Sequence, residues 1–236
     1  VAGDTGGLVK LGSSNFTLGG SGVYAGNTRV EAGTLTLAGT LASQTLDVSG
    51  GSLVLTGADR LANTAAVVVR NGASMTLAGD VSIASLVLTG TLDSSPGNTS
   101  TLSANSVALD SGIVTANLGG GSLTSSGTSR LNGTSAATTL AVNGGTLTLA
   151  GANRLTAAPA AAVAGAATLV LQGGLTLGNL AGSGAVNLGS FTLSTGSAGD
   201  SSYSGVLSGS GGLSKTGSSV FTLGGSNSYT GATDLL

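Results

Sequence analysis

A short alternating pattern that ends in glycine recurs along this chain about every twenty residues. In each copy Leu or Val alternates with Thr or Ser, so the apolar side chains share one face of a strand, and a glycine then ends that strand. The strand-ending glycines Gly19, Gly39, Gly57 and Gly79 lie 20, 18 and 22 residues apart, and Gly127, Gly151 and Gly173 lie 24 and 22 apart. Strand patterns at this period, without a helical pattern between them, predict an all-β fold, a parallel β-helix with roughly 18–24 residues per coil.

The composition favours one continuous body over residues 1–236 rather than two mixed globular domains. Only 7% of the residues are charged and 3% are aromatic, whereas an ordinary soluble domain has about a quarter charged. The apolar residues are spread evenly, so only a fold that repeats evenly can bury them. We predict about ten to twelve coils, with a core of Leu35, Leu37, Leu53, Leu55, Leu77, Leu86, Leu147, Leu149, Leu169, Leu171, Phe191, Leu193, Phe221 and Leu223.

Several partners and cofactors are not expected. A net charge of −2 without a Lys/Arg cluster argues against nucleic acid and anionic membrane surfaces. The apolar run 157–167 is broken by Pro159 and Gly165 and is shorter than the roughly 20 residues of a membrane-spanning helix, so direct membrane insertion of this segment is not expected. The chain has no Cys and no His, so we expect no disulfide, metal or cofactor. No signal peptide is expected in this segment, which opens at Val1 without a charged or apolar leader pattern.

The acidic residues do not form a pattern that suggests catalysis. The nine acids are scattered singly, and Asp59-Arg60 recurs as Asn153-Arg154 in a related segment, which an essential acid would not tolerate. Enzymatic β-helices use a few carboxylates in a groove, and they are the rival interpretation. Residues 209–216 differ by one residue from a phosphate-binding loop, but no helix pattern follows them. We therefore predict no catalytic, cofactor or metal residue, and that the chain is not an enzyme.

The remaining polar residues have structural interpretations. Arg60, Arg130 and Arg154 recur before Leu and are expected in turns, where they cover the surface. Lys10 and Lys215 are expected at a solvated edge of a coil, and Tyr24, Tyr203 and Tyr229 are expected to cap a coil or cover its flank. The Thr-x-Thr pairs at 34–36 and 146–148 leave ice binding open as a further hypothesis, although Thr is also a common exposed strand residue.

The chain repeats a longer segment at an offset of 205 residues. Residues 6–26 and 211–231 share 15 of 21 positions. We predict two repeat copies, 6–37 and 211–236, and infer that the chain is one period of a tandem array plus an overlap.

Both copies resemble the autotransporter-associated β-strand repeat, also called the passenger-associated transport repeat, whose pattern is G-x-L-x-K-x-G-x-G-x-L-x-L-x-G-x-N-x-Y-x-G-x-T. The first copy departs from it at Gly22, where the family has Asn, and the second copy departs at Ser219 and Phe221. The predicted repeat-motif residues are Leu8, Lys10, Gly12, Phe16, Leu18, Tyr24, Gly26, Leu213, Lys215, Gly217, Phe221, Leu223, Asn227, Tyr229 and Gly231.

The resemblance implies a right-handed parallel β-helix of an autotransporter passenger, exported by type V secretion through the outer membrane and displayed or released at the Gram-negative cell surface. Two hypotheses about function follow. In the first, the chain is a repetitive stalk or fibre of an adhesin that associates with itself, with neighbouring repeats, or with host or cell-surface ligands in aggregates or biofilm. In the second, it is the passive stalk of a passenger whose polysaccharide-active or protease domain lies elsewhere.

Overall fold

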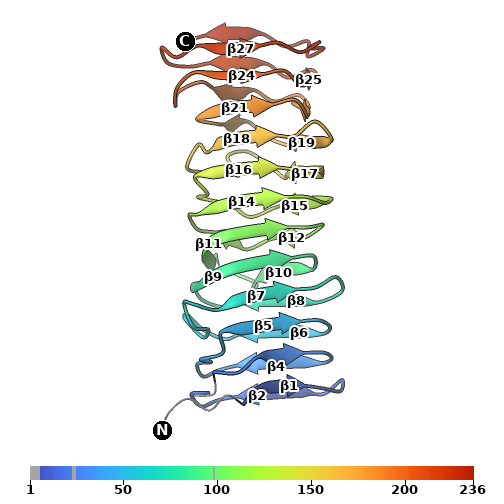
Figure 1. Ribbon diagram of the computed structural model, residues 1–236, viewed down its shortest axis with the longest axis vertical. Coiled ribbons are helices and arrows are strands. Elements are labelled where there is room, and N and C mark those ends of the chain that lie inside the picture. Colours follow the sequence, from blue (N-terminus) through green and yellow to red (C-terminus); the bar gives the residue numbers. More distant parts are fainter. Residues whose placement is uncertain (1–5, 23–24, 98) are drawn as a thin grey trace. The chain divides into compact units, whose positions relative to one another are not determined.

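The computed structural model describes residues 6–22, 25–97 and 99–236. It is a parallel β-solenoid of about 12 turns, and no helix occurs among the described residues (Figure 1). The all-β class and the parallel stacking predicted from the alternation are therefore confirmed. The strands lie in three sheets, here named A, B and C.

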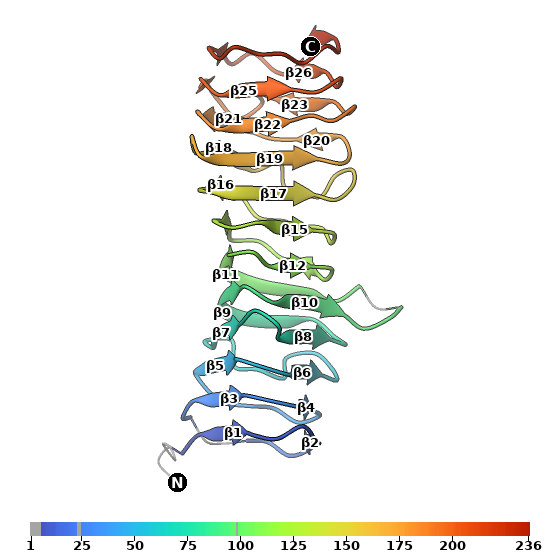
Figure 2. The same ribbon diagram turned by 90° about the vertical axis from the view of Figure 1, so that its right-hand side faces the viewer.

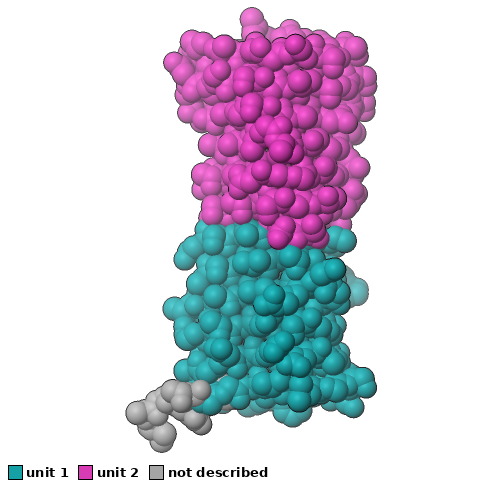
Figure 3. All heavy atoms as spheres, turned by 45° about the vertical axis from the view of Figure 1, so that its right-hand side comes forward, with its two compact units in different colours: residues 1–108, 112–120 teal, residues 109–111, 121–236 magenta. Residues whose placement is uncertain are grey.

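The chain divides into two compact units, which are described separately (Figure 3). Unit 1 comprises residues 1–108 and 112–120, and unit 2 comprises residues 109–111 and 121–236. The continuity of one body over residues 1–236 stays a prediction.

In unit 1, each coil contributes one strand to sheet A and one to sheet B. Figure 2 shows the strands of sheet B stacked one above another. Sheet A contains β1 (Leu8–Lys10), β3 (Thr28–Val30), β5 (Thr45–Val48), β7 (Ala66–Val69), β9 (Val81–Leu88), β11 (Thr101–Leu109) and β13 (Asn117–Leu118). Sheet B contains β2 (Asn15–Leu18), β4 (Thr34–Leu37), β6 (Ser52–Leu55), β8 (Ser74–Leu77), β10 (Thr91–Ser94) and β12 (Ile113–Val114).

In unit 2, sheet C adds a third side to the coils. Sheet A contains β14 (Ser122–Ser125), β16 (Thr139–Val142), β18 (Ala160–Val163), β21 (Asn179–Gly182), β24 (Ser201–Tyr203) and β27 (Phe221–Leu223). Sheet B contains β15 (Ser129–Leu131), β17 (Gly145–Leu149), β19 (Ala167–Leu171), β22 (Ala185–Asn187) and β25 (Val206–Ser208). Sheet C contains β20 (Leu175–Thr176), β23 (Leu193–Thr195), β26 (Leu213–Lys215) and β28 (Thr233–Leu235).

The strand register gives the length of each coil. The shortest described step from a residue to its partner in the next coil is 16 residues, from Thr101 to Asn117. The longest described step is 22 residues, as from Ser52 to Ser74. The predicted range of 18–24 residues overlaps this range. Coil length varies because the turns between sheets take up the insertions while the strands stay in register.

The core is formed by the inward side chains of the strands, as the alternation predicts. Most of the predicted core residues are buried, from Leu35 in unit 1 to Leu193 in unit 2. The prediction is wrong for Phe191, which is 37% exposed because it lies in a turn before β23, outside the alternation of the strand. Phe221 and Leu223 are half-buried, because β27 has a described sheet neighbour, β24, on one side only.

Turn glycines allow the coils to approach each other closely. Gly51 has a φ of +70°, and a Cβ atom placed on it would lie 2.1 Å from the carbonyl oxygen of Gly33 in the preceding coil. A side chain at this position would therefore meet both a strained backbone and a steric clash.

Candidate functional site

The repeat lysines were predicted at a solvated edge, and this is wrong for Lys10. Lys10 is 7% exposed and lies in an inward position of β1, in register with the buried Val30. Its Nζ donates hydrogen bonds to the carbonyl oxygens of Leu11, Gly12 and Ala32 at 2.9, 2.7 and 3.0 Å. The ammonium therefore satisfies carbonyl groups of two successive coils, which offsets the cost of removing the charge from water.

Lys215 repeats this arrangement in the second copy with greater exposure. It is half-buried, and its Nζ donates to the carbonyl oxygens of Thr216 and Gly217 at 2.7 and 2.8 Å. Gly12 and Gly217, which are equivalent in the repeat, have φ angles of +70° and +71°. The lysine and the left-handed glycine thus form the same turn in both copies.

Both repeat copies also close their coil through the same backbone contact. The amide of Gly26 donates to the carbonyl of Gly6, and the amide of Gly231 donates to the carbonyl of Gly211, both at 3.1 Å. The copies nevertheless use different sheets. The lysine strand is β1 of sheet A in the first copy and β26 of sheet C in the second, and the Phe strand is β2 of sheet B and β27 of sheet A. The repeat sequence therefore specifies a coil and does not specify a particular sheet.

The Asn of the motif extends a strand ladder with its side chain. The Oδ1 atom of Asn227 accepts a hydrogen bond from the amide of Leu207 at 2.9 Å, and its Nδ2 donates to the carbonyl of Gly225 at 2.8 Å. The nearby Tyr229 is half-buried, with its hydroxyl 2.7 Å from the Oγ1 of Thr233. Tyr24 lies outside the described residues.

The remaining apolar motif residues differ in how deeply their side chains are buried. Leu213 is 3% exposed, whereas Phe16 in the first copy is 45% exposed. Leu8 and Leu18 are half-buried. Leu8 and Phe16 line a surface hollow that Lys10, Ser14 and Asn15 also border.

Comparison with known proteins agrees with this repeat geometry. Residues 8–37 and 213–236 match the passenger-associated transport repeat. Two segments of this chain carry autotransporter passenger repeats. The matched segments lie within the two predicted copies, and the repeat family implies a secreted or cell-surface protein. No curated protein and no solved structure matches the chain.

Two of the three recurrent arginines lie in turns, as predicted. Asp59 and Asn153 have positive φ angles of 49° and 52°, and the arginine that follows each of them folds back over a strand-ending glycine. Arg154 donates from Nε to the carbonyl of Ala150 at 3.1 Å.

The turn prediction is wrong for Arg130, which lies on β15 in register with Thr148. Its guanidinium donates to the side-chain oxygens of Asn132 and Gln172 at 2.8 and 3.0 Å. The three arginines share a local sequence, but only two share a backbone conformation.

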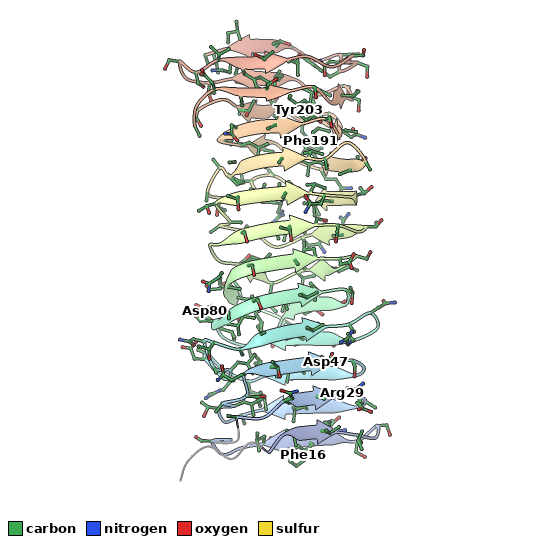
Figure 4. The ribbon with its side chains drawn as sticks, in the orientation of Figure 1. Phe16, Arg29, Asp47, Asp80, Phe191 and Tyr203 are labelled. Carbon is green, nitrogen blue, oxygen red and sulfur yellow. The ribbon has the colours of Figure 1, made fainter. Side chains whose placement is uncertain are left out.

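Tyr203 was predicted to cap or cover a coil, and this is also wrong. Its side chain is fully buried, and its hydroxyl donates to the carbonyl of Gly184 at 2.8 Å. Gly205, two residues further along the chain, leaves room for the ring, because a Cβ atom placed on it would lie 2.7 Å from both the Cζ and the hydroxyl oxygen of Tyr203. Burial raises the pKa of Tyr203 to about 12. Figure 4 shows where Tyr203 and Phe191 lie in unit 2.

Several carboxylates make local contacts that order turns and strand ends. Asp80 and Asp200 each accept a backbone amide at 2.8 Å, from Thr101 and Val220. Asp93 accepts a hydrogen bond from the hydroxyl of Thr115 at 2.6 Å. Across the described ranges, no group of three or more acidic residues is arranged to hold a metal ion, and no helix is long and apolar enough to cross a membrane. The absence of catalysis stays a prediction.

The outer face of sheet A in unit 1 carries a cluster of both charge signs. Arg70 forms two contacts with Asp47, from Nε to Oδ1 at 2.8 Å and from Nη2 to Oδ2 at 3.1 Å. Arg29 lies 3.1 Å from Glu31 and in register with Asp47. Figure 4 shows Arg29 and Asp47 on neighbouring strands of this sheet. The sequence alone does not reveal this cluster, because Arg29, Asp47 and Arg70 come from three successive coils and meet only when the coils stack.

Proposed function

We propose that this chain is a stalk module of an autotransporter passenger at the bacterial surface, and that copies of it associate side by side in aggregates or biofilm. The observation that carries the stalk is the repeat coil itself, which occurs twice and closes through the same Gly–Gly backbone contact each time. Each coil pairs with the next through parallel backbone ladders, so coils can be added without a new core or a long loop closure. A chain that emerges from a secretion pore can fold in this way, one coil after another.

The outward residues support the association. On sheet B of unit 1, successive strands present Thr34, Ser52, Ser74 and Thr91 in one column. On sheet A of unit 2, neighbouring strands present Ala141 and Ala162. Such small, uncharged side chains leave a flat face that repels a second copy little, and a flat sheet face can pack closely on another.

Imaging and sedimentation of the purified protein test this function. Side-by-side pairs that increase with concentration are the expected result, together with loss of the protein from intact cells after protease treatment. Isolated particles at every concentration would refute association and leave a passive stalk. Retention of the protein inside protease-treated cells would refute surface display.

A further inference from the structure

One surface of unit 1 has an order of charges that suits a copy of itself. Sheet A presents five outward side chains in register, one from each of the strands β1, β3, β5, β7 and β9. They are Val9, Arg29, Asp47, Val68 and Val87. Arg29 and Val9 are 52% and 54% exposed, and Asp47 keeps 30% of its side chain exposed. We call Val9, Arg29, Asp47 and Val68 the charge ladder.

We propose that the charge ladder binds the charge ladder of a second copy of this chain, which runs antiparallel to the first. This inference rests on the self-association in the proposed function and names its surface. A two-fold axis parallel to the strands, between β3 and β5, places Arg29 opposite Asp47 of the second copy. The same axis places Val9 opposite Val68 of the second copy. Symmetry repeats each contact, so a single pairing rule gives two ion pairs and two apolar contacts.

The existing ion pairs strengthen this arrangement. Within one chain, Arg29 is paired with Glu31 and Asp47 is paired with Arg70. Across the two-fold axis, the ion pair of Glu31 with Arg29 meets the ion pair of Asp47 with Arg70 of the second copy. The four charges then alternate in sign. The contacts of Arg29 within its own chain involve Nε and Nη1, and a guanidinium has five N–H donors.

The charges also select one register against its neighbours. Moving the two-fold axis onto β3 would place Arg29 against Arg29, and moving it onto β5 would place Asp47 against Asp47. Only the position between these strands pairs opposite charges, so the ladder specifies the alignment by repulsion as well as by attraction.

The contact is small and therefore weak. Four strands about 4.8 Å apart cover much less than the roughly 1,000 Å² of a stable interface. A single pair of molecules should associate weakly and lose affinity as salt screens the exposed charges. Many copies on apposed cell surfaces would still adhere, because linked weak contacts reinforce one another.

The test is sedimentation of the whole chain over a concentration series at low ionic strength. Asp47→Arg creates two like-charge contacts with Arg29 and should weaken association about tenfold or more, and Arg29→Asp should do the same. The double variant Arg29→Asp with Asp47→Arg restores opposite charges across the axis but loses the ion pairs with Glu31 and Arg70, so it should associate at least about threefold more tightly than either single variant without reaching the wild type. Circular dichroism verifies that each variant is folded.

Two control variants separate this surface from a general charge effect. Glu31→Gln neutralises a charge of the same cluster that does not face an opposite charge across the axis, and Arg130→Asp reverses an exposed charge on β15 of unit 2. Both should associate within about threefold of the wild type.

The outcomes distinguish the two proposals. If the wild type associates and the Asp47→Arg variant associates equally well, the charge ladder is refuted while self-association stands. Failure of the double variant to recover also refutes the ladder. A wild type that stays monomeric at all concentrations, or binds only a cell-surface polysaccharide, refutes both the surface and the self-association.

Discussion

Lys10 ends β1 with a buried ammonium that binds three backbone carbonyls. We predict that Lys10→Met lowers the free energy of unfolding by about 1–3 kcal/mol, because these carbonyls lose a charged donor. Urea denaturation followed by circular dichroism measures the change. Lys215→Met is the matched control and should cost less, since Lys215 is more exposed and makes two such bonds. Equal losses in the two variants would show that burial does not set the contribution of the lysine.

Tyr203 makes the unfolding free energy decrease at alkaline pH. Its pKa is about 12 when folded and near its ordinary value of 10.0 when unfolded, so the unfolded state releases the proton first as pH rises. The stabilisation from the neutral phenol is complete below pH 10 and is lost as pH approaches 12. We predict that the unfolding free energy of Tyr203→Phe falls less steeply between pH 9 and 11 than that of the wild type. Urea titrations at each pH measure the slopes, and identical slopes would contradict the prediction.

The alternation of inward and outward positions along a strand explains which residues the sequence correctly predicts to be buried and which it does not. Strand alternation places Lys10 on the same face as Leu8, so the signal for an inward lysine was present but conflicted with the general rarity of buried charge. The buried position of Tyr203 brings its hydroxyl to the carbonyl of Gly184 in the preceding coil, a neighbour that is known only once the register is known. Phe191 lies in a turn, where alternation carries no information about burial.

At the scale of the turn, close packing of the coils predicts a graded effect of glycine substitution. Gly51→Ala introduces a left-handed alanine and places its Cβ 2.1 Å from the carbonyl of Gly33. We expect a loss of about 3 kcal/mol or more of unfolding free energy, measured by urea denaturation. Gly72 has a similar φ of +79° but no atom within 4 Å of the added Cβ, so Gly72→Ala should cost only about 1–2 kcal/mol. A comparable loss in both variants would mean that backbone strain alone is responsible.

Strands were predictable as elements, whereas their assignment to sheets was not. Alternation and glycine spacing indicate strands and coils, because a side-chain period of two buries one face. The sheet to which a strand belongs depends on the summed lengths of all preceding turns, which vary from coil to coil. The two repeat copies show this directly, since nearly the same sequence forms β1 of sheet A and β26 of sheet C.

At the scale of the whole chain, pairing between adjacent coils predicts that the destabilisation caused by a substitution stays near the substituted coil. In unit 1 the strand β6 pairs with β4 and β8 alone. In unit 2 the strand β17 pairs with β15 and β19 alone. Stability in such a stack is a sum over coils and their interfaces, so a weakened interface opens by itself.

Hydrogen exchange of Gly51→Ala tests this locality. Gly51 precedes β6, and its carbonyl accepts the amide of Ser74 at 3.0 Å, so distortion there reaches the pairs of β6 with β4 and β8. We expect faster amide exchange in these three strands and unchanged exchange in β17 and β19 of unit 2. Gly72→Ala, with its smaller cost, serves as the control and should accelerate exchange less. Equal acceleration in both units would mean that the solenoid unfolds as one cooperative body, so that neither a stalk nor an array of repeats could tolerate a weak coil.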